Sequence, residues 1–271
     1  MQYFHPEHKP LVREGDTIVF TGDHITPQEP GYVGVAARVI ERFHSRLRLS
    51  LVSIGAHHQT PAALRSSGLL DAIRATRAAW LVLAVGLADA FAEPATAEIM
   101  EQYKRWLASF DEPGSLAIGA EHRWPNEPET DGEQHEVGAE RDADLHHPPQ
   151  PTNIRLERLS GFSEDLRALV EEASQAGTRC VLLTTVVVGN DVQHPVNAVL
   201  RAYNQELRAI AAGRGLPVVD VEQAFTAVYE RAATYKQRVA LTIPPATLNP
   251  QGEALVARTF LDTMGLLPRR G

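Results

Sequence analysis

The feature that most constrains this chain is the alternation of short, β-branched apolar runs with stretches of helical periodicity. The apolar runs are the expected strands, at residues 17–20, 47–53, 79–85, 179–188 and 216–221. The helical stretches between and after them are residues 32–46, 162–176, 197–214 and 252–264. Such alternation is typical of a parallel sheet covered by helices on both faces, and right-handed crossovers leave few topologies. We therefore predict a three-layer α/β/α domain with a doubly wound, flavodoxin-like, five-stranded parallel sheet.

The helical periodicity also predicts which side chains face the sheet. In the first helical stretch the apolar positions that share one face are Val35, Val39, Ile40 and Phe43. In the second they are Leu166, Leu169, Val170 and Ala173. Because apolar side chains recurring every three to four residues mark the buried face of a helix, we expect both sets to be buried.

One segment interrupts the alternation. Residues 111–151 are rich in Pro, Gly, acids and His and nearly empty of aliphatic side chains. Residues 121–150 alone hold nine acids and two arginines, which is −7 of the formal net charge of −8. Its histidines lack metal-site spacing: His122, His135, His146 and His147. We predict one domain over residues 1–271 with a disordered acidic insertion at 111–151, whose affinity for cations is weak.

Charge and hydropathy exclude several classes of function. Outside the insertion the chain is nearly neutral, so nucleic acid is not expected as a partner. The most apolar stretch, residues 78–92, is short and contains Asp89, which predicts no membrane span. The start of the sequence is polar and lacks an export signal, so we expect a cytoplasmic protein. The single cysteine, Cys180, excludes an intramolecular disulfide and is expected to be a buried thiol.

The loops after the first and third predicted strands should carry the ligand site, because ligands of open α/β sheets bind at the carboxyl ends of the strands. These loops read Thr21-Gly22-Asp23-His24-Ile25-Thr26 and Gly86-Leu87-Ala88-Asp89. They resemble two blocks of the SGNH/GDSL hydrolase family, Gly-Asp-Ser-Ile-Thr and Gly-x-Asn-Asp. The resemblance continues through Tyr203-Asn204, residues 216–220 and the run Leu248-Asn249-Pro250-Gln251-Gly252. That last run is similar to the block Leu-Asn-x-x-Gly, which follows Asp-x-x-His in the family. The resemblance implies the SGNH hydrolase fold.

The same resemblance implies that the family's catalytic set is substituted. His24 stands at the nucleophilic serine, Ala88 at the oxyanion asparagine, Thr247 at the histidine base and Pro244 at its aspartate. His58 matches the oxyanion glycine and Ser53 the leading residue of that block, or Gly55 supplies the glycine if the loop is shifted. A serine needs a base to take its proton, and threonine cannot do so at neutral pH. We expect His24, His58, Ala88 and Thr247 together at the carboxyl edge of the sheet.

Several residues around this cleft allow more than one interpretation. His24, His57 and His58 either fill the former cleft, supply a nucleophile for phosphoryl transfer, or bind a metal together with Asp23 or Asp89. The candidate metal set is His24, His58 and Asp89. Asp23 is expected to bind loop amides, and Asp89 to cap the following helix. His194 is either a displaced base or an exposed loop histidine. In the last strand's loop, Asp220 is expected to cap a helix that starts near Glu222.

Two hypotheses follow for the function. The first is a non-catalytic protein of the SGNH hydrolase fold, a pseudoenzyme that binds a small molecule or a protein partner in the altered cleft. The second is an esterase, acylhydrolase or phosphoesterase that works through a rearranged, histidine-rich site, with or without a metal. No cofactor is expected. We favour the first hypothesis, because nucleophile, base, orienting carboxylate and oxyanion donors are replaced together.

Overall fold

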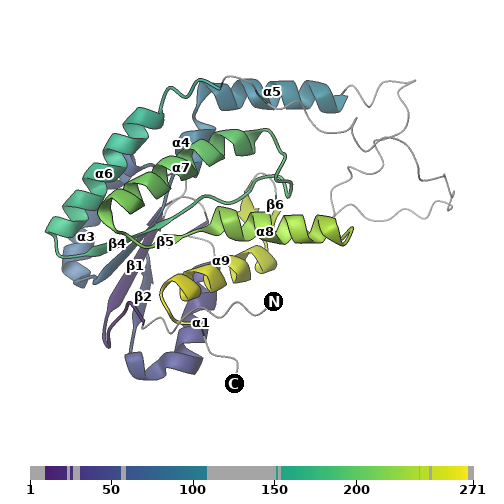
Figure 1. Cartoon of the computed structure of the whole chain (residues 1–271). Helices are drawn as coiled ribbons and strands as arrows, with labels where there is room; N and C mark the ends of the chain where they lie inside the picture. The colour runs from purple at the N-terminus through teal and green to yellow at the C-terminus, as the bar shows by residue number, and fades with distance from the viewer. Residues whose placement is uncertain are drawn as a thin grey trace.

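A five-stranded parallel sheet forms the centre of the computed structural model (Figure 1). The structure describes residues 10–22, 25–26, 31–55, 59–108, 151, 154–237, 239–243 and 246–267. The strands are β1 (Thr17–Gly22), β2 (Ser50–Ser53), β3 (Trp80–Ala84), β4 (Arg179–Leu183) and β5 (Val218–Val219). Their order is β2-β1-β3-β4-β5, and every neighbouring pair is parallel. The predicted flavodoxin-like, doubly wound sheet is therefore confirmed.

All five predicted strands are present, but β2, β3, β4 and β5 are shorter than the sequence suggested. Residues 45–47 form a 3-10 turn before β2, and β4 ends at Leu183 although Val186, Val187 and Val188 beyond it are still buried. A run of β-branched residues indicates a buried segment, which need not be a strand. Residues 186–188 are buried but are not paired in the sheet. Strands β1, β3 and β4 are almost wholly buried, as expected for a sheet covered on both faces.

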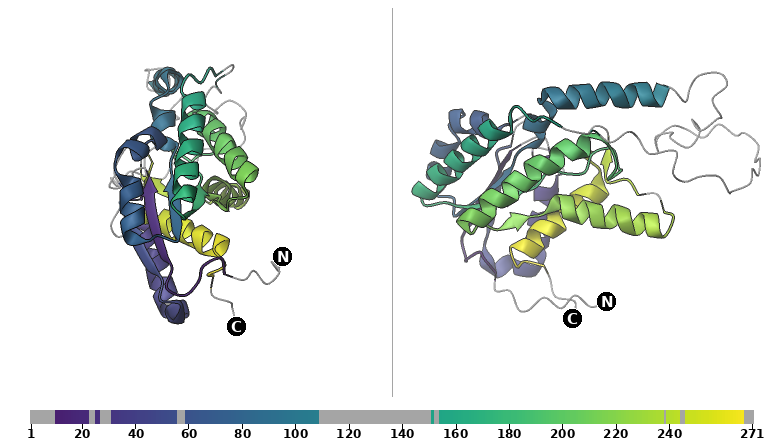
Figure 2. Two further views of the ribbon diagram at one scale, coloured as in Figure 1. Left: turned by 90° about the vertical axis from the view of Figure 1, so that its left-hand side faces the viewer. Right: turned by 45° about the horizontal axis from the view of Figure 1, so that its top comes forward.

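The helices form two layers, which the contacts between them define. The helices α1 (Tyr32–His44), α8 (Val221–Thr234) and α9 (Pro250–Thr263) make one group, in which α9 packs against the other two. The second group is α2 (Pro61–Ser66), α3 (Leu69–Thr76), α6 (Leu159–Gln175) and α7 (Val196–Arg214). In Figure 2, α6 and α7 lie side by side. The predicted three-layer arrangement is confirmed.

The prediction for the buried face of α1 is wrong in part. Tyr32, Val33, Ala36 and Ile40 are buried, whereas Phe43 is 54% exposed. Phe43 lies in the last turn, where periodicity gives the direction of a side chain around the helix but not how far along the helix the core extends. In α6 the predicted set, Leu166, Leu169, Val170 and Ala173, is buried as expected. Cys180 is also buried, and burial raises the pKa of its thiol to about 12.

Helix α5 (Pro94–Ala108) follows the short helix α4 (Leu87–Phe91) and extends away from the sheet (Figures 1 and 2). The carboxylate of Glu93, which is 1% exposed, joins the start of α5 to the start of α6. It accepts hydrogen bonds from the backbone N–H groups of Glu157 and Arg158 and from the Tyr203 hydroxyl, at 3.0, 2.9 and 2.6 Å. The predicted insertion lies outside the described residues apart from Pro151, so its disorder stays a prediction.

Sequence periodicity did not predict α2, α3, α4, α5 or the hairpin of β6 (Thr242–Ile243) and β7 (Thr247–Leu248). Most of these elements are short, and helices of five to eight residues carry too little periodic signal to be recognised. The cap at α8 was recognised: Asp220 is its N-cap and accepts a hydrogen bond from the Gln223 N–H at 3.1 Å. Among the helices described, none is long and apolar enough to cross a bilayer.

Candidate functional site

The structure describes five of the ten predicted site residues: Gly55, Ala88, Asp89, His194 and Thr247. The other five, Asp23, His24, His57, His58 and Pro244, lie outside the described residues, and their roles stay predictions. Gly55 follows β2 and Ala88 follows β3, so both lie at the carboxyl edge of the sheet. Thr247 lies in the β6–β7 hairpin, which is bonded to the loop after β4 at the same edge. Described parts of three predicted blocks therefore meet at one edge.

Gly22 ends β1 where the backbone of β1 comes closest to β3. Its φ is +138°, and a Cβ added there would lie 1.9 Å from the carbonyl oxygen of Ala84, so only glycine fits. Beyond it, the Ser53 hydroxyl donates to the carbonyl oxygen of Thr26 at 3.2 Å. This bond ties the loop after β1 to the end of β2, which are the two places where the predicted nucleophile and oxyanion blocks lie.

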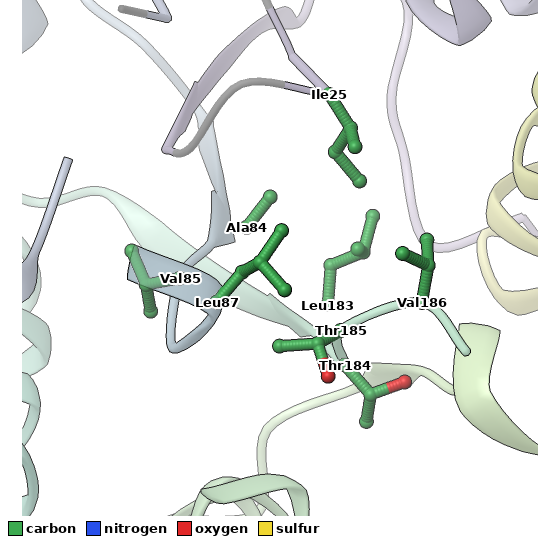
Figure 3. Close-up of a pocket in the computed structure, with 8 residues that line it drawn as sticks. All are labelled: Ile25, Ala84, Val85, Leu87, Leu183, Thr184, Thr185 and Val186. Carbon is green, nitrogen blue, oxygen red and sulfur yellow. The ribbon is translucent and has the colours of Figure 1, made fainter. Parts of the chain in front are cut away.

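A shallow hollow, too narrow to admit a water molecule, lies between the ends of β1, β3 and β4 (Figure 3). Its described lining is aliphatic apart from two threonines: Ile25, Ala84, Val85, Leu87, Leu183, Thr184, Thr185 and Val186. Figure 3 shows Ile25, Leu87 and Val186 extending toward the space from three different segments. None of these lining side chains titrates near neutral pH. The described part of the hollow therefore offers neither room for a bound group nor an acid or base.

Helix α4 places Ala88 and Asp89 directly after β3. Gly86, with φ of +107°, is its N-cap and makes no side-chain capping bond. Asp89 lies inside the first turn, so the expectation that it caps the following helix is wrong. Its Oδ2 is buried without a hydrogen-bond partner among the described residues, and this burial raises the pKa of the carboxyl group to about 6. Ala88 presents a methyl group, which cannot donate a hydrogen bond to an oxyanion.

The position of Thr247 is fixed by the start of α9. Asn249 is the N-cap of this helix, and its Oδ1 accepts from the N–H groups of Gln251 and Gly252 at 3.0 and 2.9 Å. A Cβ on Gly252 would lie 2.1 Å from the carbonyl oxygen of Leu241, so the glycine permits the hairpin to approach the helix. The run Leu248-Asn249-Pro250-Gln251-Gly252 thus folds as one unit, with Thr247 in β7 just before it.

His194 does not lie in an exposed loop: it is 7% exposed, so the expectation of an exposed histidine is wrong. Its ring packs edge-on against Tyr103 of α5, with ring centroids 4.7 Å apart. Burial lowers the pKa of His194, although the nearby Asp191 acts in the opposite direction. The Val196 N–H faces His194 Nδ1 at a long 3.4 Å, so a backbone donor lies at that nitrogen.

Asp191 and His194 have the spacing Asp-x-x-His, a signal that the sequence analysis did not use. The geometry does not make them a catalytic pair. Asp191 Oδ1 accepts from the Gln193 N–H at 2.8 Å instead of from the imidazole ring. The spacing produces a turn, in which the His194 N–H donates to the Asp191 carbonyl oxygen at 3.1 Å.

Two buried amide side chains hold the backbone after β4, a role that the sequence did not predict. Asn204 Oδ1 accepts from the N–H and hydroxyl of Thr185 at 2.8 and 3.1 Å, while its Nδ2 is buried without a partner among the described residues. Asn197 holds both backbone groups of Val188.

Within the described ranges, no three His, Cys, Asp or Glu side chains are grouped so as to hold a metal. The alternative metal site of His24, His58 and Asp89 includes two undescribed residues and stays a prediction.

Comparison with known proteins gives one family and a consistent fold. A model of the GDSL-like lipase/acylhydrolase family matches residues 15–241. A catalytic mutant of Axe2, an acetylxylan esterase from Geobacillus stearothermophilus, is 17% identical with a TM-score of 0.62, over 96% of this chain and 99% of that chain. LAE5, an alpha/beta hydrolase enzyme from the metagenome of Lake Arreo, Spain, has the same identity and TM-score, over 95% and 99% of the two chains.

A third structure, the acetyl xylan esterase AlAXEase, is 15% identical with a TM-score of 0.61, over 91% of this chain and 98% of that chain. No curated protein matches the sequence. At these identities the similarity to solved structures establishes the fold, and the fold expected from the sequence blocks is confirmed.

Proposed function

This chain belongs to the GDSL-like lipase/acylhydrolase family, and we propose that it is a non-catalytic member that binds a small molecule or a protein partner in the altered cleft at the carboxyl edge. Members of one fold family differ in function, because the side chains at the site decide which reaction, if any, takes place.

The observation that carries the proposal is the threonine at position 247. The run from Leu248 to Gly252 resembles the family block Leu-Asn-x-x-Gly, and the Asn249 cap and the close packing of Gly252 hold it as one unit. The family's histidine base precedes that block, and here the position is Thr247 on β7. A hydroxyl group does not accept a proton at neutral pH, so a serine or water nucleophile would have no base at this position.

The residues around α4 support the same conclusion. Loss of one oxyanion donor costs about 100-fold to 1000-fold in turnover, and Ala88 offers no side-chain donor. The catalytic mutants of Axe2 change a serine, an aspartate and a histidine to alanine. In this chain the sequence positions that match such a triad are His24, Pro244 and Thr247. The described lining of the hollow is aliphatic apart from two threonines, so it supplies no group for proton transfer.

One observation favours the alternative, a hydrolase with a rearranged site. Burial raises the pKa of Asp89 to about 6, close to the range in which a general base works. Together with His24, His57 and His58, this carboxylate would form a histidine-rich site for ester or phosphoester hydrolysis. A backbone N–H lies at Nδ1 of the buried His194, so this ring is a weaker candidate for the base.

Assays of the purified wild-type protein separate the two functions. We expect no hydrolysis of p-nitrophenyl acetate or p-nitrophenyl phosphate above the protein-free rate, and no bound metal by elemental analysis. Hydrolysis of either compound by the wild type would overturn the proposal. If His24→Ala or Asp89→Asn then abolished this activity and a serine-directed inhibitor did not, the rearranged histidine-rich site would be the one at work. Because several neighbours are named acetylxylan esterases, acetylated xylo-oligosaccharides are the first probes for binding, by thermal shift.

Restoring the family set provides the positive control. The restored chain carries His24→Ser, His58→Gly, Ala88→Asn, Pro244→Asp and Thr247→His. We expect it to show measurable but low esterase turnover, because a misplacement of about 1 Å can cost 100-fold. His24→Ser alone should give none, because the members of a catalytic triad act as a unit. Turnover by the single variant equal to that of the restored chain would show that another base already operates.

A further inference from the structure

We infer that Asn190 is the positioning residue of this site: its side-chain amide holds the β6–β7 hairpin, here called the strap, at the carboxyl edge and so sets where position 247 lies. The strap comprises Thr242–Ile243 and Thr247–Leu248. The inference rests on the proposed function only in treating position 247 as part of the ligand site.

The strap needs an anchor because its own pairing is minimal. Each strand has two residues, and the register pairs only Thr242 with Leu248 and Ile243 with Thr247. A two-stranded hairpin of this kind is marginal in water without further packing. At its base, the Asn249 N–H donates to the Leu241 carbonyl oxygen at 3.1 Å, which holds the strap to α9. A second anchor must hold it to the sheet.

Asn190 supplies that second anchor. Its Oδ1 accepts from the N–H groups of Leu241 and Thr242 at 3.0 and 2.9 Å and from the Thr242 hydroxyl at 2.9 Å. The Tyr229 hydroxyl of α8 donates to the same oxygen at 2.9 Å. Asn190 Nδ2 donates to the carbonyl oxygen of Thr242 at 2.9 Å. An amide oxygen has two lone pairs, so four donors around it make an unusually crowded acceptor.

Asn190 is itself held rigidly to β4. It adopts the left-handed conformation with φ of +56°, and Gly189 before it has φ of +77°. A Cβ on Gly189 would lie 2.7 Å from His194 Cδ2, so the buried imidazole occupies the space that the glycine leaves. Asn197 Oδ1 accepts from the Val188 N–H at 2.9 Å, and its Nδ2 donates to the Val188 and Asp191 carbonyl oxygens at 3.1 and 2.8 Å. Asn197 therefore holds the backbone on both sides of Gly189 and Asn190.

Because Asn190 and Asn249 hold the strap through backbone groups, its position does not depend on the side chain at 247. A threonine, histidine or cysteine at that position should occupy the same place on the edge. The role of Asn190 can therefore be measured without any enzymatic activity, by a reporter side chain placed at position 247.

The reporter is Thr247→Cys, whose thiol is titrated with a chromogenic aryl disulfide. The natural Cys180 is buried with its pKa raised to about 12, so it stays unreactive in the folded protein. Adding Asn190→Ala should raise the labelling rate at position 247 by about tenfold or more, because several buried backbone groups lose their partner. Asn190→Asp keeps an acceptor oxygen for the four donors but turns a second carboxylate oxygen toward the Thr242 carbonyl oxygen, so it should slow the labelling only in part relative to Asn190→Ala.

Two controls separate positioning from general destabilisation. Val82→Ala, in the middle of β3, should lower the melting temperature without changing the labelling rate at low temperature. Tyr229→Phe removes one of the four donors and should give a small increase. The inference would be overturned if adding Asn190→Ala to the Thr247→Cys chain left the labelling rate unchanged. It would also be overturned if Val82→Ala raised that rate as much as Asn190→Ala does.

Native-state hydrogen exchange keeps the inference testable if Asn190→Ala does not fold. In the wild type, the amides of Leu241 and Thr242 should exchange about as slowly as those of β4, and exchange at the rate of exposed loops would overturn the inference. Esterase activity of the wild type would contradict the proposed function but would leave both results on Asn190 unchanged.

Discussion

The loops that follow β3 and β4 leave the same edge of the sheet but treat their buried polar groups in opposite ways. After β4, the side chain of Asn197 makes three hydrogen bonds to the backbone of its own loop. After β3, Asp89 Oδ2 is buried with no partner among the described residues, and burial raises the pKa of the carboxyl group. A satisfied network stabilises a loop, whereas an unpaired buried carboxylate destabilises it. The loop after β4 is a scaffold, and the loop after β3 is the better candidate for a functional role.

The largest effect should come from breaking the network after β4. Asn197→Ala removes three hydrogen bonds and leaves the N–H and carbonyl groups of Val188 buried without a partner. We expect a loss of about 3 kcal/mol in the free energy of unfolding, measured by urea denaturation. Arg201→Ala is the matched control, because Arg201 makes only one long bond to this loop, at 3.3 Å. A loss from Asn197→Ala as small as the control's would show that the loop does not depend on this network.

An effect of opposite sign is expected after β3. Asp89→Asn keeps the shape of the side chain and removes the charge, so the variant should be more stable than the wild type at pH 7.5 by about 1 kcal/mol. A shift of two pKa units corresponds to about 2.7 kcal/mol, and the partial exposure of the carboxyl group reduces that figure. The measurement is urea denaturation of both chains at pH 7.5 and pH 5.

The pH dependence tests the cause of that gain. The pKa of Asp89 in the folded state, about 6, lies above the ordinary value of 3.8. The protonated carboxyl group is therefore favoured by folding, and this contribution is lost as the pH rises through 6. The advantage of Asp89→Asn should grow between pH 5 and pH 7.5. A destabilising Asp89→Asn at pH 7.5 would mean that the carboxylate has a partner beyond the described residues.

The smallest effect concerns His194, the buried imidazole of the β4 loop. Its pKa is lowered by burial, so folding favours the neutral ring. The contribution of His194 to stability is complete above its ordinary pKa of 6.5 and is lost as the pH falls below it. Between pH 7.5 and pH 5.5, the wild type should lose somewhat more unfolding free energy than His194→Gln, by less than about 1 kcal/mol. Identical slopes for both chains would show that the imidazole is not desolvated.

Sequence patterns predicted the features that depend on local order. The five strands were placed by their β-branched runs, and the helix cap at Asp220 was recognised because an aspartate after a strand accepts from the first turn of a helix. The same reasoning placed a cap at Asp89, where Gly86 starts α4 three residues earlier. Two aspartates after two strands look alike in the sequence, and only the backbone between strand and helix distinguishes them.

Burial at the ends of elements was not predictable in the same way. Phe43 follows the apolar period of α1 and is exposed, while His194 lies in a polar loop beside a proline and is buried. His194 is buried because Tyr103 of α5 covers its ring and Gly189 leaves space for it. These neighbours are distant in the sequence or lack a side chain, so no local pattern contains them.

The sequence by itself determined the layered α/β/α fold, because alternation of apolar runs and amphipathic helices leaves a doubly wound sheet as the stable arrangement. The resemblance of its sequence blocks also predicts which residues stand at the positions of the family's catalytic set, and this assignment stays a prediction. Only the tertiary structure decided that the strap is held by Asn190 across 52 residues of chain, and that Oδ2 of Asp89 lacks a hydrogen-bond partner among the described residues. Hydrogen bonding and desolvation depend on which groups meet in space, and a linear pattern does not record that.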